Sequence, residues 1–348
     1  HCNCSLLNTK IRLLGDVDPK TGQRKRAFLD TPDLTLYAAF GEIQKRYQYP
    51  HKIVTATGKN SKERVLKAIE LLNGSVSLAA SVQSTDPEVL KIVKRDNISL
   101  DNIVSEVHAT SVLGGNYSEI ILGLPGDSLQ KHVKSMLDMI DCGIKNLRVG
   151  QLMILNDTPM ASPAYQQKYG LQTRYRFLTK GFIKLPLAGG EQILIEEEKI
   201  SVGTSDMSFA DYLRARVAGL LVNIFYNDRF IPDNLVFFKQ QNFSLSGYMA
   251  ALIDVPRSPA IEGVLAQFVA HLQTELFESR EQMQEFLTRK DTFKRLLSGE
   301  IGINLTSFYT QACRKNRQDL LAMESSVMSK LATAHVADYL TVQCPLKI

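Results

Sequence analysis

Residues 117–143 read YSEIILGLPGDSLQKHVKSMLDMIDCG, and this stretch decides the fold. Its first part is short and nearly all apolar, as in a buried strand, until it breaks at Gly-Leu-Pro-Gly. The second part repeats apolar residues at helical spacing and closes at Gly143. The apolar stripe of this predicted helix is formed by Leu129, Val133, Met136, Leu137 and Ile140. A strand, a turn and an amphipathic helix in this order predict one β/α unit.

The same alternation of strand and helix extends to both sides of this stretch. HKIVTAT at 51–57, SVSLAASV at 75–82 and NLRVGQLMIL at 146–155 predict three more strands. Strands without polar alternation are typically buried on both faces, in parallel sheets whose crossovers are right-handed. Four such strands within about 110 residues predict an α/β fold, either a barrel or partial barrel or a doubly wound sheet.

The helices of these units carry recognisable start and stop signals. Ser61 is expected to cap the helix that follows the first strand, and Gly74 to end it. Asp86 is the predicted N-cap of the next helix, with Pro87 at its first position.

Polar and turn residues follow each of the four predicted strands. These loops read TATGKN (55–60), SVQST (81–85), LGLPGD (122–127) and ILNDTP (154–159). In either candidate fold the chemistry sits at the carboxyl ends of the strands. We therefore expect the four loops to converge on one rim.

The rhythm of the sequence changes in its second half. GFIKLPLAGGEQILIEEEKISVGTSDMS at 181–208 predicts a hairpin or small sheet that turns at Gly189-Gly190. Residues 208–227 and 258–287 predict two long amphipathic helices. We divide the chain into a β/α domain at 1–180 and an α-rich domain at 181–348.

Composition limits the partners and the compartment. The chain of 348 residues has a formal charge of +5 and five cysteines at scattered positions. No stretch reaches the ~20 apolar residues that a membrane span needs. A mild, dispersed basic excess predicts no nucleic-acid partner, and an odd number of scattered cysteines favours a reducing compartment. We expect a cytoplasmic protein without membrane or nucleic-acid partners.

Three motifs together resemble radical S-adenosylmethionine (SAM) enzymes. SVQSTDPEVLKIVKRDN (81–97), SEIILGLPGDS (118–128) and LMILNDTPMA (152–161) are similar to the fourth, fifth and sixth strand ends of this family. The similarity is closest to the cobalamin-binding subgroup and covers about residues 51–165. It implies a partial (β/α) TIM-like barrel, followed here by a mainly helical C-terminal domain with a small β-hairpin.

The resemblance also implies a reaction. A 4Fe-4S cluster would cleave SAM reductively and generate a 5′-deoxyadenosyl radical, and cobalamin-dependent members transfer a methyl group to the substrate. Cobalamin would be held by an upstream domain, and an electron donor such as flavodoxin or ferredoxin is implied. The substrate, a small molecule or a peptide, is not indicated.

The cluster motif of the family is Cys-x-x-x-Cys-x-x-Cys, and His1-Cys2 resembles its end. We expect Cys2 to be a cluster ligand and the sequence to begin inside the cluster loop of a longer reading frame. Taken alone, Cys2 and Cys4 fit a weak metal scavenger or two inert thiols better than cluster ligands.

The resemblance assigns cofactor binding to Asn60, Gln83, Ser84, Arg95, Glu119, Gly123 and Gly126. Gln83 and Arg95 would contact the ribose or the aminocarboxylate end of SAM, because a guanidinium forms a planar fork for a carboxylate. Glu119 would accept from the ribose hydroxyls or the amino group. The two glycines would let the backbone approach the adenine.

Structural explanations stand beside these roles. Arg95 fits a cation at a helix end, Glu119 an ordinary rim charge and Gly123 a turn residue. The sequence also departs from the subgroup in two places. Asp127 stands where the subgroup has Glu, and residues 15–26 leave little room for the first helix and second strand of the barrel.

Two other classes of function stay open. One is a degenerate, non-catalytic β/α barrel that serves as a binding or scaffold protein. The other is a non-radical barrel enzyme, which would need a nucleophile or a metal cluster on the rim.

Overall fold

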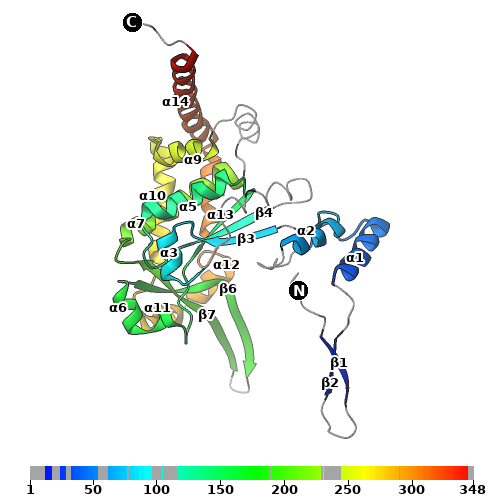
Figure 1. The fold of residues 1–348 in the computed structure, drawn as a ribbon. Helices are drawn as coiled ribbons and strands as arrows, with labels where there is room; N and C mark the ends of the chain where they lie inside the picture. The colour runs from blue at the N-terminus through cyan, green and yellow to red at the C-terminus, as the bar shows by residue number, and fades with distance from the viewer. Residues whose placement is uncertain are drawn as a thin grey trace. The chain divides into compact units, whose positions relative to one another are not determined.

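A computed structural model of the chain describes most of its residues, and the elements named below are labelled in Figure 1. The described ranges are 12–17, 24–28, 33–53, 62–76, 78–95, 104, 116–187, 190–228, 230, 244–289 and 291–343. The chain divides into two compact units. Unit 1 comprises His1–Val82, Ile98–Glu119 and Cys142–Arg148; unit 2 comprises Gln83–Asn97, Ile120–Asp141 and Val149–Ile348.

The N-terminal part of unit 1 contains a hairpin and two helices. β1 (Arg12–Val17) pairs antiparallel with β2 (Arg24–Phe28), and the helices are α1 (Asp33–Tyr47) and α2 (Lys62–Leu71). The helices pack through a small core of Tyr37, Ala68, Ile69, Leu72 and Val76. The hairpin and α1 were not predicted from the sequence.

The predicted end of α2 is confirmed. Gly74 adopts a φ of +70°, the left-handed conformation in which helices commonly end. The predicted cap Ser61 lies outside the described residues.

A three-stranded sheet contains three of the four predicted strands. β3 (Leu78–Gln83), β4 (Asn116–Leu122) and β5 (Asn146–Gln151) lie in the order β3-β4-β5, as successive β/α units require. The fourth predicted strand is represented by Ile53, which forms a parallel bridge with Val76. The mixed α/β prediction is therefore confirmed. Within the described residues the sheets have two, three and two strands, and none of them closes into a barrel.

The predicted start of the helix after β3 and the predicted end of the helix after β4 are both confirmed. α3 (Pro87–Ile92) starts after Asp86, whose side chain accepts from the backbone N–H groups of Glu88 and Val89. α5 (Leu129–Asp141) ends before Gly143, which has a φ of +78°.

The predicted apolar stripe of α5 is wrong in part. Its buried residues are His132, Ser135, Met136, Met139 and Ile140. The predicted stripe residues Leu129, Val133 and Leu137 instead line a groove on another side of the helix. Helical spacing alone could not separate the two sides, because α5 has apolar neighbours on both.

The second half of the chain begins with the predicted hairpin. β6 (Gln172–Leu187) pairs antiparallel with β7 (Gly190–Gly203), and the pairing extends to Leu187 opposite Gly190. The hairpin is longer than predicted, and β6 runs through residue 180. The proposed division into domains at this position stays a prediction.

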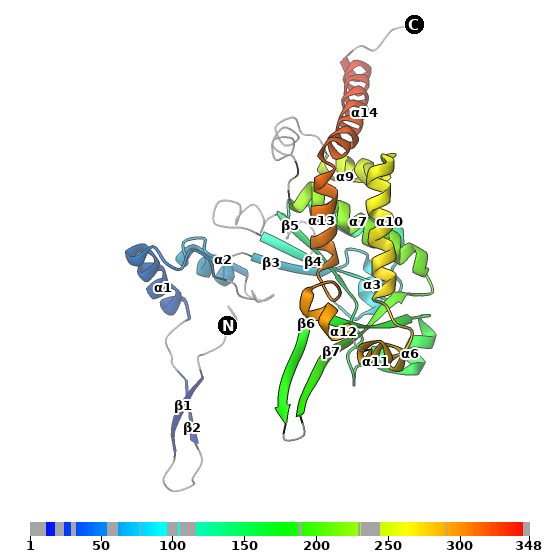
Figure 2. The same cartoon turned by 180° about the vertical axis from the view of Figure 1, so that it is seen from behind.

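Helices follow the hairpin, and Figure 2 shows α10 beside α13. The helical segments after β5 are η1 (Pro159–Ala161), α6 (Pro163–Lys168), α7 (Phe209–Val222), η2 (Asn223–Asn227), α9 (Leu245–Asp254), α10 (Pro259–Thr274), α11 (Arg280–Thr288), α12 (Thr292–Ser298), α13 (Leu305–Lys315) and α14 (Arg317–Gln343).

The single helix predicted over 258–287 is wrong. α10 ends at Thr274, and α11 begins only at Arg280 after the N-cap Ser279. Between them Phe277 exchanges two 2.8 Å backbone hydrogen bonds with Tyr175 of β6. A long-range strand bridge therefore interrupts the helical pattern.

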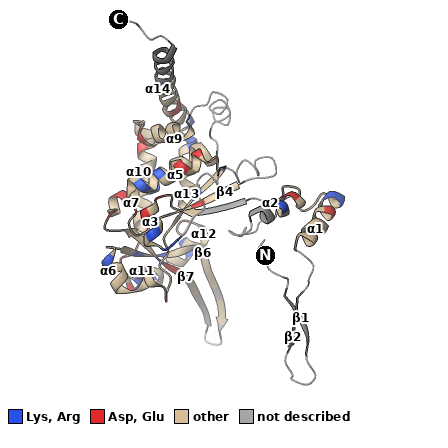
Figure 3. Ribbon diagram, viewed as in Figure 1, with Lys and Arg blue, Asp and Glu red and all other residues tan. Residues whose placement is uncertain are grey.

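Basic and acidic residues are interspersed along the helices of unit 2 (Figure 3). Among the described residues, no helix combines the length and the apolar character needed to cross a bilayer.

The cap of α3 yields a first prediction. Replacing Asp86 by Ala removes the acceptor for two backbone N–H groups and should lower the free energy of unfolding by about 1 kcal/mol. Asp86→Asn keeps an acceptor oxygen and should lose less. Urea unfolding of both variants measures the difference, and equal losses would show that capping is not the cause.

Candidate functional site

Two of the four predicted rim loops, at 122–127 and 154–159, meet in unit 2. Leu152, directly after β5, forms backbone hydrogen bonds with β4 and with β7. Its N–H donates to Leu122 O (2.9 Å), and its carbonyl oxygen accepts from Ser201 N–H (2.9 Å). Beneath the loops, Val89 of α3 packs with Leu124, Leu152 and Ile154 in one apolar cluster. The predicted loop at 55–60 lies outside the described residues.

Gln83 ends β3 in an unusual backbone conformation. Its φ is +68°, a region that costs a residue with a side chain about 1–3 kcal/mol. The half-buried side chain makes no hydrogen bond to any other described residue. Gln83 therefore combines a strained backbone with a side-chain amide that has no hydrogen-bond partner among the described residues.

Ser84, the next residue, is committed to packing. It is buried, and its Oγ accepts from Asp86 N–H (3.2 Å) and lies 3.3 Å from Ser135 Oγ on α5. The predicted cofactor role of Ser84 is thus accompanied by a clear structural one.

Arg95 lies just beyond the C-terminal end of α3. Its backbone N–H donates to Leu90 O (3.0 Å) and closes the helix. The side chain is half-buried, and this desolvation lowers the pKa of its guanidinium below the ordinary value. The position fits a helix-end cation, and the contact with SAM stays a prediction.

Gly123 and Gly126 form the turn after β4, with φ values of +87° and +78°. A Cβ on Gly123 would lie 3.0 Å from the backbone oxygen of Ser201 in β7. A Cβ on Gly126 would lie 2.5 Å from Ile92 Cδ1 in α3. The left-handed backbone therefore favours glycine at both positions, and at Gly123 the contact with the β7 backbone favours it further.

Asp127 completes this turn and faces the interior. Its carboxylate accepts from Ser128 N–H (3.0 Å) and lies 3.3 Å from His132 Nδ1, and both the Asp127 and His132 side chains are 1% exposed. With a proton on Nδ1, His132 would donate to this carboxylate. The shorter side chain that replaces the subgroup's Glu thus has a structural partner.

Glu119 lies within β4 and not at its end. Its carboxylate is 3.7 Å from the guanidinium of Arg148 in β5, with the two side chains 47% and 59% exposed. The same guanidinium lies 4.3 Å from the centroid of the Tyr117 ring. Glu119 belongs to unit 1 and Gln83 to unit 2, so their predicted convergence stays a prediction.

The predicted metal ligand Cys2 and the predicted cofactor residue Asn60 lie outside the described residues. Cys142 and Cys313 are buried, and burial raises the pKa of the Cys313 thiol to about 11. Across the described ranges, no three His, Cys, Asp or Glu residues gather where they could hold a metal ion.

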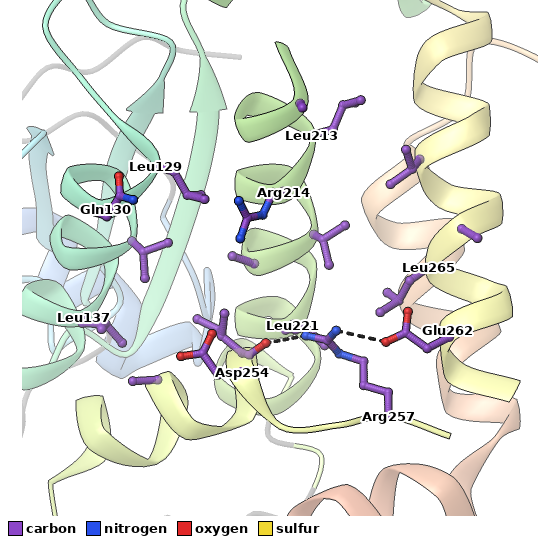
Figure 4. Close-up of a pocket in the computed structure, with 18 of the residues that line it drawn as sticks. Leu129, Gln130, Leu137, Leu213, Arg214, Leu221, Asp254, Arg257, Glu262 and Leu265 are labelled. Atoms are coloured by element: carbon purple, nitrogen blue, oxygen red, sulfur yellow. Dashed lines mark hydrogen bonds and ion pairs between the residues drawn. The ribbon is translucent and has the colours of Figure 1, made fainter. Parts of the chain in front are cut away.

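Unit 2 also contains a groove of about 1110 Å³ between α5, α7, α9 and α10. In Figure 4, Leu137 of α5, Leu221 of α7 and Leu265 of α10 line it, and Arg257 lies between Asp254 and Glu262. The Arg257 guanidinium binds Glu262 (3.2 Å) and the backbone oxygen of Ile253. None of the predicted cofactor residues that the structure describes lines this groove.

Comparison with known proteins adds an independent observation. No protein-family model matches the chain. Two curated proteins are each 31% identical to it over 150 residues: the cobalamin-dependent radical SAM methyltransferase TokK of Streptomyces tokunonensis, and a 2-(S-pantetheinyl)-carbapenam-3-carboxylate methyltransferase of Streptantibioticus cattleyicolor. Over these 150 residues the chain is similar to a cobalamin-dependent radical SAM methyltransferase and to a second methyltransferase.

This similarity supports the subgroup that the motifs predicted. The aligned region comprises 40% of this chain and spans 21% of the length of each relative. The assignment of individual site residues is not tested by these similarities.

The two glycines of the turn after β4 yield a second prediction. Gly126→Ala should cost about 1–2 kcal/mol of stability, because its φ is +78° while the end of the Ile92 side chain can move aside. Gly123→Ala should cost about 1 kcal/mol more, since the added methyl group meets backbone of β7.

Urea unfolding of the two variants measures these costs. The double variant Gly126→Ala with Ile92→Val removes the overlapping methyl group and should regain only part of the loss. Equal costs at the two glycines would contradict the packing explanation.

Proposed function

We propose that this chain is the SAM-binding part of a cobalamin-dependent radical SAM methyltransferase. The similarity to two methyltransferases of this kind carries the proposal. Gln83 supports it from the structure, because an uncommitted amide on a strained backbone stands at a predicted cofactor position.

Each predicted residue has a definite task in this proposal. The Gln83 amide would donate to and accept from the ribose or the amino acid end of SAM. The Arg95 guanidinium remains charged at neutral pH despite its lowered pKa, and it would bind the carboxylate. The backbone of the turn from Gly123 to Gly126 would approach the adenine on the side that faces away from Ser201 and Ile92.

The chemistry beyond binding belongs to groups that this chain does not hold in its described part. A bound 4Fe-4S cluster would supply the electron for the reductive cleavage of SAM in such an enzyme. We propose Cys2 as one cluster ligand, a TIM-like barrel as the full fold and cobalamin as the methyl carrier. A cytoplasmic location and reduction by flavodoxin or ferredoxin complete the proposal, and its substrate class stays open.

A third prediction tests the binding step. Gln83→Ala should raise the Kd for SAM about 5- to 100-fold, the loss expected when about 1–3 kcal/mol of hydrogen bonding is removed. Isothermal titration calorimetry of the chain with SAM measures the change. Gln167→Ala, which alters an exposed residue of α6, should leave the Kd unchanged.

Two outcomes would contradict the proposed function. One is an unaltered chain that shows no affinity for SAM. The other concerns the longest reading frame that contains this chain, reconstituted anaerobically with iron and sulfide. It should release 5′-deoxyadenosine from SAM, and methylation should further require cobalamin. No deoxyadenosine would favour the non-catalytic binding or scaffold protein.

A further inference from the structure

The loops that carry Gln83 and the two turn glycines are both attached to one side of α5. The attachment is made by the polar residues Lys131, His132, Ser135 and Asp138, which we call the polar seam of α5. These positions follow helical spacing and therefore share a side of the helix. The adjoining apolar residues Met136, Met139 and Ile140 are fully buried.

Ser135 holds the turn after β3. Its Oγ accepts from Thr85 N–H (3.0 Å) and lies 3.3 Å from Ser84 Oγ, and both serines are at most 2% exposed. Thr85 Oγ1 donates to Asp138 Oδ2 at 2.6 Å. The turn directly after Gln83 is thus fixed to α5 by its backbone and by two side chains.

His132 and Lys131 hold the turn after β4. His132 Nδ1 meets the Asp127 carboxylate, while Lys131 Nζ donates to Gly126 O (3.4 Å) and to Glu88 Oε2 (2.7 Å). The hydrogen bond with Glu88 is the main cause that raises the pKa of Lys131. Lys131 therefore links the start of α3 to the turn after β4.

Burying these polar groups has a cost that apolar packing would avoid. Hydroxyl and imidazole groups lose hydration when they are buried, and His132 Nε2 has no hydrogen-bond partner among the described residues. Their hydrogen bonds go to the loops that carry predicted cofactor residues. A strained conformation such as that of Gln83 persists only when its surroundings fix it, and the Ser135 contacts with Ser84 and Thr85 do so one residue away.

We propose that Ser135 and His132 are positioning residues for SAM binding. Ser135 acts through Gln83 by fixing the turn that orients its side chain. His132 acts through the backbone between Gly123 and Gly126. The inference rests on the proposed function, because SAM is the ligand for which both loops are positioned.

The first experiment is a double-mutant cycle on the full chain, with SAM as the titrated ligand. Ser135→Ala deletes a single oxygen and should raise the Kd about tenfold. In the Gln83→Ala background the same change should raise the Kd less than about twofold, because its effect passes through Gln83. A merely structural role would give independent, multiplicative effects on the Kd.

A control separates ligand affinity from stability. Thr310 is buried in α13, and its Oγ accepts from Asn223 Nδ2 at 3.0 Å. Thr310→Val removes a comparable buried hydroxyl outside both loops, so it should lower the melting temperature and leave the Kd for SAM unchanged.

The second experiment tests His132 with a matched pair of variants. Asn places an N–H near the position of Nδ1 and can still donate to Asp127, whereas Leu cannot. His132→Asn should change the Kd less than about twofold, and His132→Leu should raise it about fivefold or more. Equal affinity of the two variants would overturn the positioning role of His132.

The outcomes separate the inference from the function on which it rests. If the unaltered chain does not bind SAM, both fall. If it binds and Gln83→Ala weakens binding, but Ser135→Ala leaves the Kd unchanged or acts independently of Gln83, only the inference falls. Faster amide hydrogen exchange at Ser84 and Thr85 in Ser135→Ala would support the anchor without any ligand, and unchanged exchange would overturn it.

Discussion

Ser135 on α5 accepts a hydrogen bond from Thr85, a residue 50 positions earlier in the chain. The bond is partly buried, and a backbone N–H that is left there without a partner costs about 1–3 kcal/mol. That constraint ties the end of β3 to the helix that follows β4. The left-handed backbone of Gln83 lies two residues from this bond, and such a conformation persists only where its surroundings fix it.

The features predicted well from the sequence are those that short-range chemistry determines. The Asp86 cap, the Gly143 stop and the antiparallel hairpin all follow from residues close together in the chain. The failures involve distant partners. The helix predicted over 258–287 breaks where Phe277 pairs with Tyr175, about a hundred residues earlier, and no local pattern encodes that bridge. The prediction of which apolar residues of α5 are buried was wrong in part. Apolar residues on two sides of a helix recur with the same helical spacing, so the spacing does not show which side is buried.

The candidate site was predictable as a set of residues but not as a geometry. Motif similarity selected Gln83, but the sequence does not indicate its φ of +68°. It also does not indicate that its side chain has no hydrogen-bond partner among the described residues. His132 and Ser135 were missed altogether. The available signal was two polar residues among the apolar positions of a predicted core helix. Burying polar side chains costs free energy unless they form hydrogen bonds, so both residues should have had partners. Glu119 was expected at a strand end, whereas β4 continues to Leu122 and leaves it inside the strand.

The turn glycines show why one observation can serve two explanations. A Cβ would project from a glycine in one direction only, and at Gly123 that direction points to the backbone of Ser201. Packing therefore accounts for the residue type, and substitution there disturbs the fold whether or not a ligand approaches the opposite side of the turn. Gln83 differs, because no other described residue uses its amide. Truncating it changes no described hydrogen bond, so a loss of affinity at this position reports on ligand contact and not on packing.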